Sequence, residues 1–150
     1  MHVNIIRSLA GAALLAASVM ATEAVAVELK VLSADASKTA LQELAADFEK
    51  ASGHKLKIEY APTADVEKKV AADDEYDVVI IDQSAANKLT RSAKLVGGTT
   101  KILFKGDPDI VYIGTTLTQT EQPIPAMALI DFLASAKAKD VYKAKGLQPG

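Results

Sequence analysis

The sequence contains no cysteine and no tryptophan, and its aromatic residues are limited to three phenylalanines and four tyrosines. Without cysteine the chain has no disulfide bond, no cysteine-ligated iron–sulfur cluster and no thiolate chemistry. Small exported domains often rely on disulfides, so an exported chain without them must be held together by its hydrophobic core. With so few aromatic residues, we expect this core to be aliphatic and rich in alanine.

A large excess of charge of one sign is also lacking. Seventeen basic and nineteen acidic side chains leave a net charge of −2, so neither a nucleic acid nor an anionic membrane is indicated as a partner. After residue 26 the chain has a single histidine, His54, which directly follows Gly53. Zinc sites need several nitrogen or sulfur ligands, so we interpret His54 as a surface residue.

No catalytic arrangement is evident in the sequence. Ser33, Ser37 and Ser84 have no histidine placed to activate them. The acidic run at residues 73–75 supplies fewer converging oxygens than a hard cation requires. The sequence therefore predicts no enzyme, no bound metal and no cofactor.

The first 26 residues have the features of a secretory signal peptide. Arg7 precedes an apolar run at residues 9–20, and small residues follow at Ala24 and Ala26. The run is short and rich in alanine for a membrane span, and an uncleaved anchor is the alternative. We expect export to the periplasm and cleavage after Ala26, which leaves a single domain at residues 27–150.

The remaining chain alternates between strand and helix patterns. Apolar runs predict strands at residues 29–32, 55–60 and 77–81, and helical spacing of apolar residues predicts helices near 41–52, 63–71 and 85–92. This order predicts an α/β protein, a three-layer αβα lobe with a mainly parallel sheet covered by helices on both faces.

The pattern changes after residue 98. Residues 101–104 and 110–114 are predicted to be two short strands joined by a turn at 105–109. Prolines at 123 and 125 precede a strongly apolar helix predicted at 126–135. A last helical turn is predicted at 141–146.

The turn from Ser33 to Ser37 joins the first predicted strand to the first predicted helix and is a candidate anion site. The start of a helix has unpaired N–H groups and a positive dipole end, and the hydroxyls of Ser33 and Ser37 add possible donors. The alternative is that Asp35, Ser37 or Thr39 caps the helix.

Two later turns have the same character. Thr63 and Ser84 are predicted to cap the second and third helices. Ligands in open α/β sheets bind at the carboxyl ends of the strands. The turns at 33–37, 62–63 and 82–84 should therefore lie along one edge of the sheet.

Segments spread over nearly the whole chain after residue 26 resemble the molybdate-binding proteins of periplasmic ABC importers. These segments are Leu29–Ser37, Phe48 with Gly53-His54-Lys55, Tyr60–Ala64, Tyr76–Ile80, Ala128–Ser135 and Lys145–Pro149. The resemblance implies one lobe of a type II periplasmic binding protein, a small oxyanion as ligand and an ABC importer permease as partner.

The resemblance also implies anion ligands at the first two turns. The matching positions are Ala36, with Ser37 beside it, and Thr63. Together with Ser33, whose hydroxyl belongs to the same turn, they make up the predicted ligand-binding residues Ser33, Ala36, Ser37 and Thr63.

Members of the family carry a second lobe, inserted about where this chain passes from Val96 to Ile113. Here a short strand pair fills that place. Without a closing lobe an anion would stay half solvated, and water competes for each hydrogen bond, so we expect weak binding. A second copy of the chain in a homo-oligomer is one way to supply the missing wall. The alternative function is a periplasmic protein-interaction module that has lost its ligand.

Overall fold

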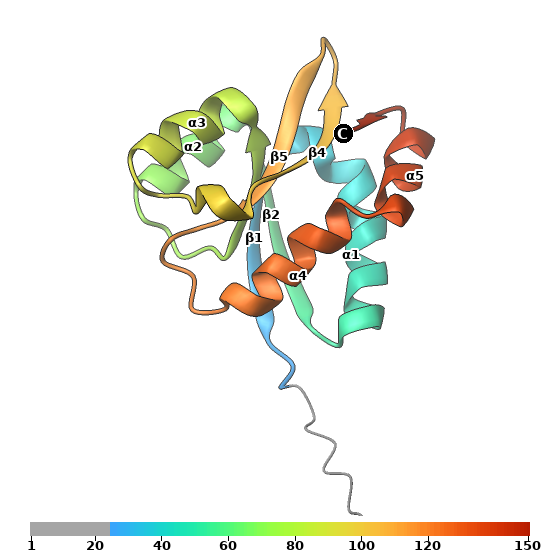
Figure 1. The fold of residues 1–150 in the computed structure, drawn as a ribbon, viewed down its shortest axis with the longest axis horizontal. Coiled ribbons are helices and arrows are strands. Elements are labelled where there is room, and N and C mark those ends of the chain that lie inside the picture. Colours follow the sequence, from blue (N-terminus) through green and yellow to red (C-terminus); the bar gives the residue numbers. More distant parts are fainter. Residues whose placement is uncertain (1–24) are drawn as a thin grey trace, which may run out of the picture.

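The computed structural model describes residues 25–150, which form one six-stranded sheet with helices on both faces (Figure 1). The predicted signal peptide lies outside the described residues except for its last two positions. Val25 and Ala26 are exposed, and the first strand begins two residues later.

The elements follow one another largely as predicted. The strands are β1 (Glu28–Ala34), β2 (Lys55–Ala61), β3 (Val78–Asp82), β4 (Lys101–Gly106), β5 (Ile110–Thr116) and β6 (Gln148–Pro149). The helices are α1 (Lys38–Ser52), α2 (Thr63–Ala71), α3 (Gln83–Arg91), α4 (Pro123–Leu133) and α5 (Ala136–Ala144), with short 3-10 turns η1 (Asp35–Ser37) and η2 (Gly97–Thr99).

The sheet has the strand order β2-β1-β3-β5-β4-β6. β1 pairs in parallel with β2 and β3, as the alternating order predicts. β5 runs antiparallel to both β3 and β4, and β6 runs antiparallel to β4. The α/β class is confirmed, and the sheet is parallel in one half and antiparallel in the other. The three-residue connection between β4 and β5 explains the antiparallel pairing of these two strands, because a connection this short can join only antiparallel strands.

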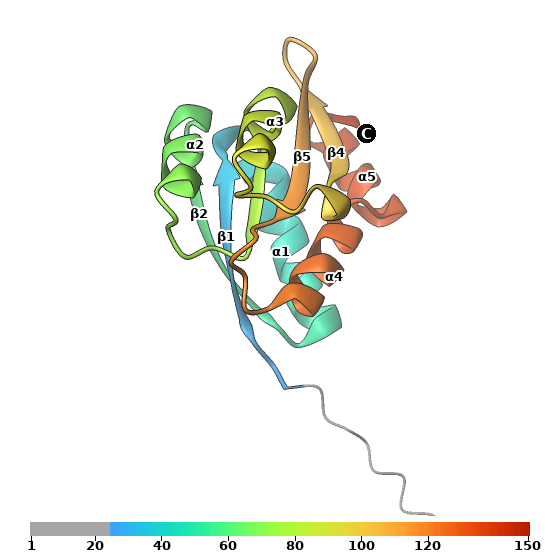
Figure 2. The same cartoon turned by 60° about the vertical axis from the view of Figure 1, so that its left-hand side comes forward.

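Each face of the sheet is covered by its own helices, which lie on opposite sides of the sheet in Figures 1 and 2. Apolar side chains of α1, α4 and α5 pack on one face in a cluster that includes Leu44, Leu129 and Val141. Apolar side chains of α2 and α3 pack on the other face around Val66 and Leu89. Most of the stabilising apolar burial lies in these two layers.

β3 lies between the two clusters. Its residues from Val78 to Ile81 are all buried, with Val79 at 0% and Ile80 at 1% exposure. A strand buried on both faces has a continuous apolar sequence, and the predicted central strand is confirmed.

The predicted caps of the second and third helices are wrong. Pro62, not Thr63, is the N-cap of α2, and Thr63 is its first helical residue. Asp82, not Ser84, caps α3, and its carboxylate accepts a hydrogen bond of 2.9 Å from the backbone N–H of Ala85. Gly53 ends α1 in the left-handed conformation at φ 75°, which glycine adopts at little cost.

The carboxyl-terminal helices also differ from the prediction. α4 begins at Pro123 and ends at Leu133, and the side chain of Ser135 then accepts a hydrogen bond from the N–H of Ala138 at the start of α5. A capping serine interrupts a helix because its hydroxyl replaces the carbonyl of the preceding turn. The helix predicted at 126–135 ends at Leu133, and the helical turn predicted at 141–146 belongs to a longer second helix, α5, which begins after Ser135.

None of the helices within residues 25–150 has the length and apolar character needed to cross a bilayer.

Candidate functional site

The amino ends of three helices lie along one edge of the sheet. β1, β2 and β3 are parallel, and each is followed directly by η1 with α1, by α2 and by α3. The hairpin between β4 and β5 is at the same end, where it projects beyond the helices (Figure 1). We call this end the carboxyl edge.

Backbone N–H groups are available at the carboxyl edge. The first N–H groups of a helix have no partner inside the helix, which applies to Asp35 and Ala36 at the start of η1. At the start of α2, the carbonyl of Pro62 accepts from the N–H groups of Asp65 and Val66 at 2.9 and 3.0 Å. This pattern leaves the preceding N–H of Thr63 for solvent or a ligand.

The two serines of the first turn face the protein interior. Ser33 and Ser37 are 0% and 2% exposed, and their hydroxyls form a hydrogen bond with each other. Both hydroxyls also lie within hydrogen-bond distance of the Ala34 carbonyl, at 3.3 and 3.1 Å. Each hydroxyl has one hydrogen, so one donates to the carbonyl while the other donates to its neighbour.

This arrangement contradicts the alternative interpretation, in which Asp35, Ser37 or Thr39 caps α1. Ser37 occupies the N-cap position of α1 but makes no capping hydrogen bond, and neither does the residue that precedes η1. Thr39 lies within the helix. The hydroxyl of Ser37 is held by Ser33 instead, so it does not reach the helix N–H groups.

The other two predicted site residues are accessible. Ala36 is exposed in η1, and Thr63 is half-buried at the start of α2. The register pairs Ala34 with Ala61, so the turns that follow them lie side by side. The fold therefore brings all four predicted residues to the carboxyl edge, with two hydroxyls inside it and two positions on its surface.

Two carboxylates accompany these groups. Asp35 is exposed in η1, and Asp82 ends the neighbouring strand. Ser33 is paired with Ile80, and Asp35 and Asp82 each lie two residues further along these parallel strands, so the two carboxylates are neighbours at the carboxyl edge. Any anion at the carboxyl edge would meet their negative charge, which opposes the attraction of the helix N-termini.

Sequence reasoning missed Tyr112, which lies opposite Asp82 in the pairing of β3 with β5. Its ring is 8% exposed and stacks on Phe104 with the ring centroids 5.0 Å apart. Burial and the Asp82 carboxylate raise the pKa of the Tyr112 hydroxyl. No hydrogen bond of this hydroxyl is found within residues 25–150, and no buried side-chain oxygen there lacks a partner, so the Tyr112 oxygen reaches the surface. Its position in a strand was predictable, but its strand neighbour was not.

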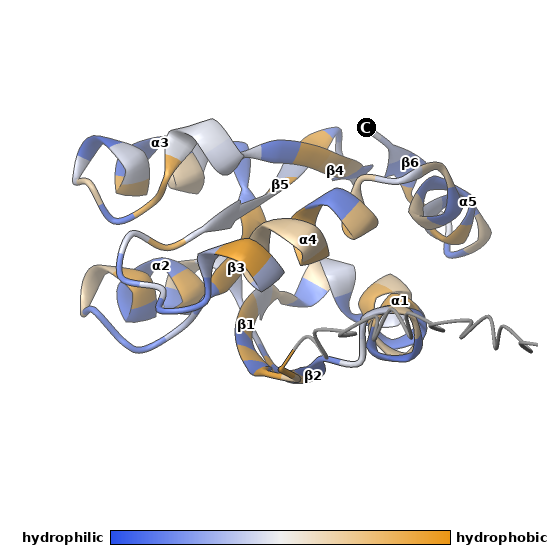
Figure 3. Ribbon diagram, turned by 60° about the horizontal axis from the view of Figure 1, so that its bottom comes forward, coloured by the Kyte–Doolittle hydropathy of each residue, from blue (hydrophilic) through white to orange (hydrophobic). Residues whose placement is uncertain are grey.

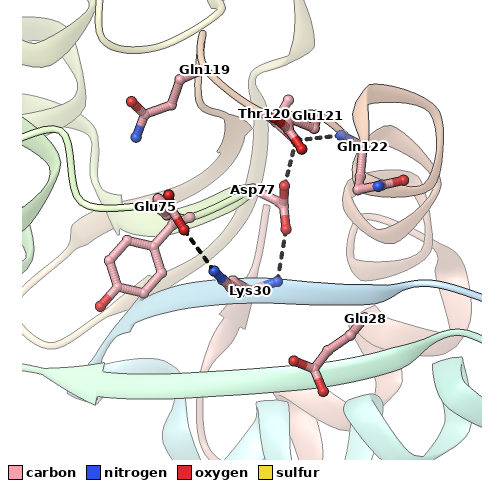
Figure 4. Close-up of a pocket in the computed structure, with 9 residues that line it drawn as sticks. Glu28, Lys30, Glu75, Asp77, Gln119, Thr120, Glu121 and Gln122 are labelled. Atoms are coloured by element: carbon pink, nitrogen blue, oxygen red, sulfur yellow. Dashed lines mark hydrogen bonds and ion pairs between the residues drawn. The ribbon is translucent and has the colours of Figure 1, made fainter.

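A polar hollow of about 320 Å³ lies at the opposite end of the sheet (Figure 4). Asp77 is central to it. Its carboxylate accepts from the backbone N–H of Lys30 at 2.8 Å and from the hydroxyl of Thr120 at 2.6 Å, and the Lys30 ammonium pairs with Glu75 at 3.0 Å. These contacts tie β1 to the segments before β3 and α4. None of the predicted site residues lines this hollow.

Within residues 25–150, no group of three or more histidine, aspartate or glutamate side chains is arranged to hold a metal ion.

Comparison of the sequence with known protein families gives one matching family. The family described as bacterial extracellular solute-binding protein matches residues 29–112, more than half of the 150-residue chain. No curated protein matches the sequence.

Several solved structures have the same fold. The substrate-binding domain assigned to a molybdenum ABC transporter of Clostridium difficile superposes with a TM-score of 0.76 at 12% identity, covering 83% of this chain and 100% of that chain. The periplasmic molybdate-binding protein of Azotobacter vinelandii gives 0.74 at 13% identity, covering 81% and 99%. The sulfate-binding protein SubI of Mycobacterium tuberculosis gives 0.69 at 8% identity, covering 82% and 87%. At these identities the similarity establishes the fold.

Proposed function

Because the chain belongs to the family of bacterial extracellular solute-binding proteins, we propose that it binds a small oxyanion of the molybdate class and delivers it to an ABC importer. The family consists of binding proteins rather than enzymes, so recognition and release are the chemistry required of the chain. In this proposal residues 27–150 act in the periplasm as a single binding lobe after removal of a signal peptide.

The observation that carries the proposal is the alignment of three helix N-termini along the carboxyl edge. Each helix end offers N–H donors and a positive dipole end, and together they favour an anion. In our proposal the anion accepts hydrogen bonds from the N–H groups of Ala36 and Thr63 and from the hydroxyl of Thr63. The buried pair of Ser33 and Ser37 supports the turn from inside. One of the two hydroxyls can turn away from the Ala34 carbonyl and donate a hydrogen bond to the ligand instead.

Tyr112 extends this site. Its hydroxyl is a donor while it is protonated, and a tyrosine is protonated at neutral pH even with its ordinary pKa of 10.0. The ligand then lies between η1, the start of α2 and the start of β5.

The proposal is compatible with weak affinity. Asp35 adds a negative charge to the turn that would hold the anion, and the edge is open to water. A permease that engages this edge would complete the enclosure of the solute. Both features favour rapid release over tight storage.

A thermal-shift titration with molybdate, tungstate, sulfate and phosphate tests the proposal. A ligand at 100 times its dissociation constant adds about 2.7 kcal/mol to the stability of the folded protein, so the melting temperature should rise with at least one oxyanion. Chloride at matched ionic strength is the control. No rise with any oxyanion at millimolar concentration would refute oxyanion binding.

Two variants at one position separate backbone from side-chain contacts. Thr63→Ala removes the hydroxyl alone, whereas Thr63→Pro removes both the hydroxyl and the N–H. Proline is favoured at the first position of a helix, so α2 should persist in both variants. We expect binding to weaken in Thr63→Ala and to weaken further in Thr63→Pro.

A periplasmic protein-interaction module is the second candidate function. The outer side of α4 favours it, because Ile124 is 81% exposed and Met127 is 47% exposed. Neighbouring exposed apolar side chains are typical of protein contacts. This function would be preferred if no oxyanion shifted the melting temperature.

A further inference from the structure

β2 is an edge strand of the sheet. It pairs with β1 on one side, and no strand of residues 25–150 pairs with its other side. In Figure 3, β2 lies at one end of the sheet between the layers of α1 and α2. Its seven residues, Lys55–Ala61, form a regular strand without a proline or a bulge.

The free side of β2 carries unused backbone groups. The N–H of Lys55 donates to the Val27 carbonyl at 2.9 Å, and the parallel register then directs the N–H groups of residues 57 and 59 toward β1. The N–H groups of Leu56, Ile58 and Tyr60 point outward. Glu49 accepts that of Leu56 at 2.8 Å, and within the described chain no partner is found for the other two.

The side chains of β2 are sorted by face. Lys55, Lys57 and Glu59 are exposed on the face that α2 and α3 cover elsewhere. Leu56, Ile58 and Tyr60 are half-buried on the α1 face, where they contact the core cluster of α1, α4 and α5. An added strand would cover the exposed flank of these three apolar side chains.

We propose that β2 pairs antiparallel with β2 of a second copy of this chain, with the two copies of Ile58 directly opposite each other. In this register Lys57 of each copy faces Glu59 of the other, and Leu56 faces Tyr60. Opposite charges and apolar side chains that face each other across strands are stabilising. The outward N–H and C=O groups of Ile58 then pair across the two-fold axis.

The charges select this register over its neighbour. A shift that centres the pairing on Lys57 would place the two copies of Lys57 opposite each other, and like charges directly opposite are unfavourable. Glu59 is already oriented by the ammonium of Lys69 at 2.9 Å and by the hydroxyl of Tyr76 at 2.6 Å. Lys57 has no ion pair among residues 25–150, so its charge is available for a partner.

The pairing does not depend on the proposed solute site. Antiparallel pairing directs the carboxyl edges of the two copies in opposite directions, so both remain open. A single strand pair with its flanking side chains makes a small interface. Stable interfaces typically bury about 1,200–2,000 Å² in total, and we therefore expect a dimer that dissociates on dilution.

Sedimentation velocity on the natively processed protein tests the proposal over a range of concentrations. The wild-type protein should change from monomer to dimer as concentration rises. Lys57→Glu should raise the dissociation constant at least tenfold, because the introduced carboxylate would face the carboxylate of Glu59 in the other copy. The double variant Lys57→Glu with Glu59→Lys restores opposite charges and should recover most of the association.

Lys55→Glu is the control, and it differs from Lys57→Glu in also removing the ion pair of Lys55 with Glu49 at 3.8 Å. It makes the same charge change on the same face, but in the Ile58-centred register residue 55 faces Ala61 and no charge. The Lys57-centred register would instead pair residue 55 with Glu59. Equal effects of Lys55→Glu and Lys57→Glu would therefore contradict the proposed register.

Hydrogen exchange gives an independent readout. In the dimer the N–H groups of Ile58 and Tyr60 should exchange more slowly as concentration rises, whereas that of Leu56, held by Glu49, should change less. A protein that stays monomeric at all concentrations, with unprotected Ile58 and Tyr60, would overturn the proposal. Oxyanion binding measured in the same samples would remain unaffected by that outcome.

Discussion

Ser33 at the end of β1 and Ser37 at the end of η1 form a hydrogen bond with each other inside the protein, and both hydroxyls contact the carbonyl of Ala34. This contact joins the last residues of β1 to the 3-10 turn η1 that precedes α1. It closes the turn from inside while the exposed side of the same turn faces solvent.

Replacement of either serine by alanine should lower stability. We expect Ser33→Ala and Ser37→Ala each to cost about 0.5–1.5 kcal/mol, the usual net value of a hydrogen bond. The two changes remove the same contact, so the double variant should cost less than the sum of the single variants. Urea unfolding of the four proteins measures this coupling, and strictly additive losses would show that the hydroxyls act independently.

Asp35→Asn should strengthen oxyanion binding. Two unit charges about 4 Å apart interact by roughly 1 kcal/mol even at the dielectric constant of water, so removal of this repulsion should raise molybdate affinity severalfold. Glu121→Gln makes a similar charge change at the opposite end of the sheet and should have little effect. Calorimetric titration compares them, and equal affinities of Asp35→Asn and the wild type would place the anion away from η1.

Ile80→Ala should strongly destabilise the fold. Ile80 is 1% exposed in the central strand, and deletion of a large aliphatic side chain from a packed core costs about 2–5 kcal/mol. Ile102→Ala is the control, because Ile102 is 47% exposed on β4 and should cost much less. Denaturant unfolding that shows similar losses for both variants would contradict the central position of β3.

Stability should fall at alkaline pH through Tyr142. Its hydroxyl donates to the Leu133 carbonyl at 2.8 Å, and burial raises its pKa above the ordinary value of 10.0. The neutral phenol thus contributes stability that is present below pH 10 and is lost as the pH rises toward the folded-state pKa. Unfolding free energies between pH 8 and pH 12 should decline less steeply in Tyr142→Phe. An identical decline would assign the effect to other groups.

Cleavage after Ala26 should produce the mature chain. Ala26 is exposed, and Val27 is held by the fold, since its N–H donates to His54 Nδ1 at 3.3 Å and its carbonyl accepts from Lys55 at 2.9 Å. The peptidase would therefore act on an accessible segment next to the first ordered strand. The intact mass of the exported protein checks this prediction.

Two variants make the processing test specific. Signal peptidase reads small residues at alternate positions, so Ala26→Leu should block cleavage whereas Val25→Leu should permit it. A mass that retains residues 1–26 in the wild-type protein would show that the segment is an anchor.

The sequence by itself determined the order and type of most elements. The apolar run that ends at Ile81 specifies a strand buried on both faces, and Gly53 specifies a helix end. Both signals are local, because a residue's side-chain period and backbone preference act within a few positions of the chain. The carboxyl edge follows from the same local order, since each parallel strand leads directly into a helix.

Only the tertiary structure decided what those elements place together. Contacts between strands decide three features of the site and the sheet. These are the burial of Ser33 and Ser37, the position of Tyr112 opposite Asp82, and the position of β2 as an edge strand. A strand pattern states which residues alternate but not which strand lies beside them. Strand neighbours are set by how the two helical layers pack on the sheet as a whole, and that packing involves residues far apart in the chain.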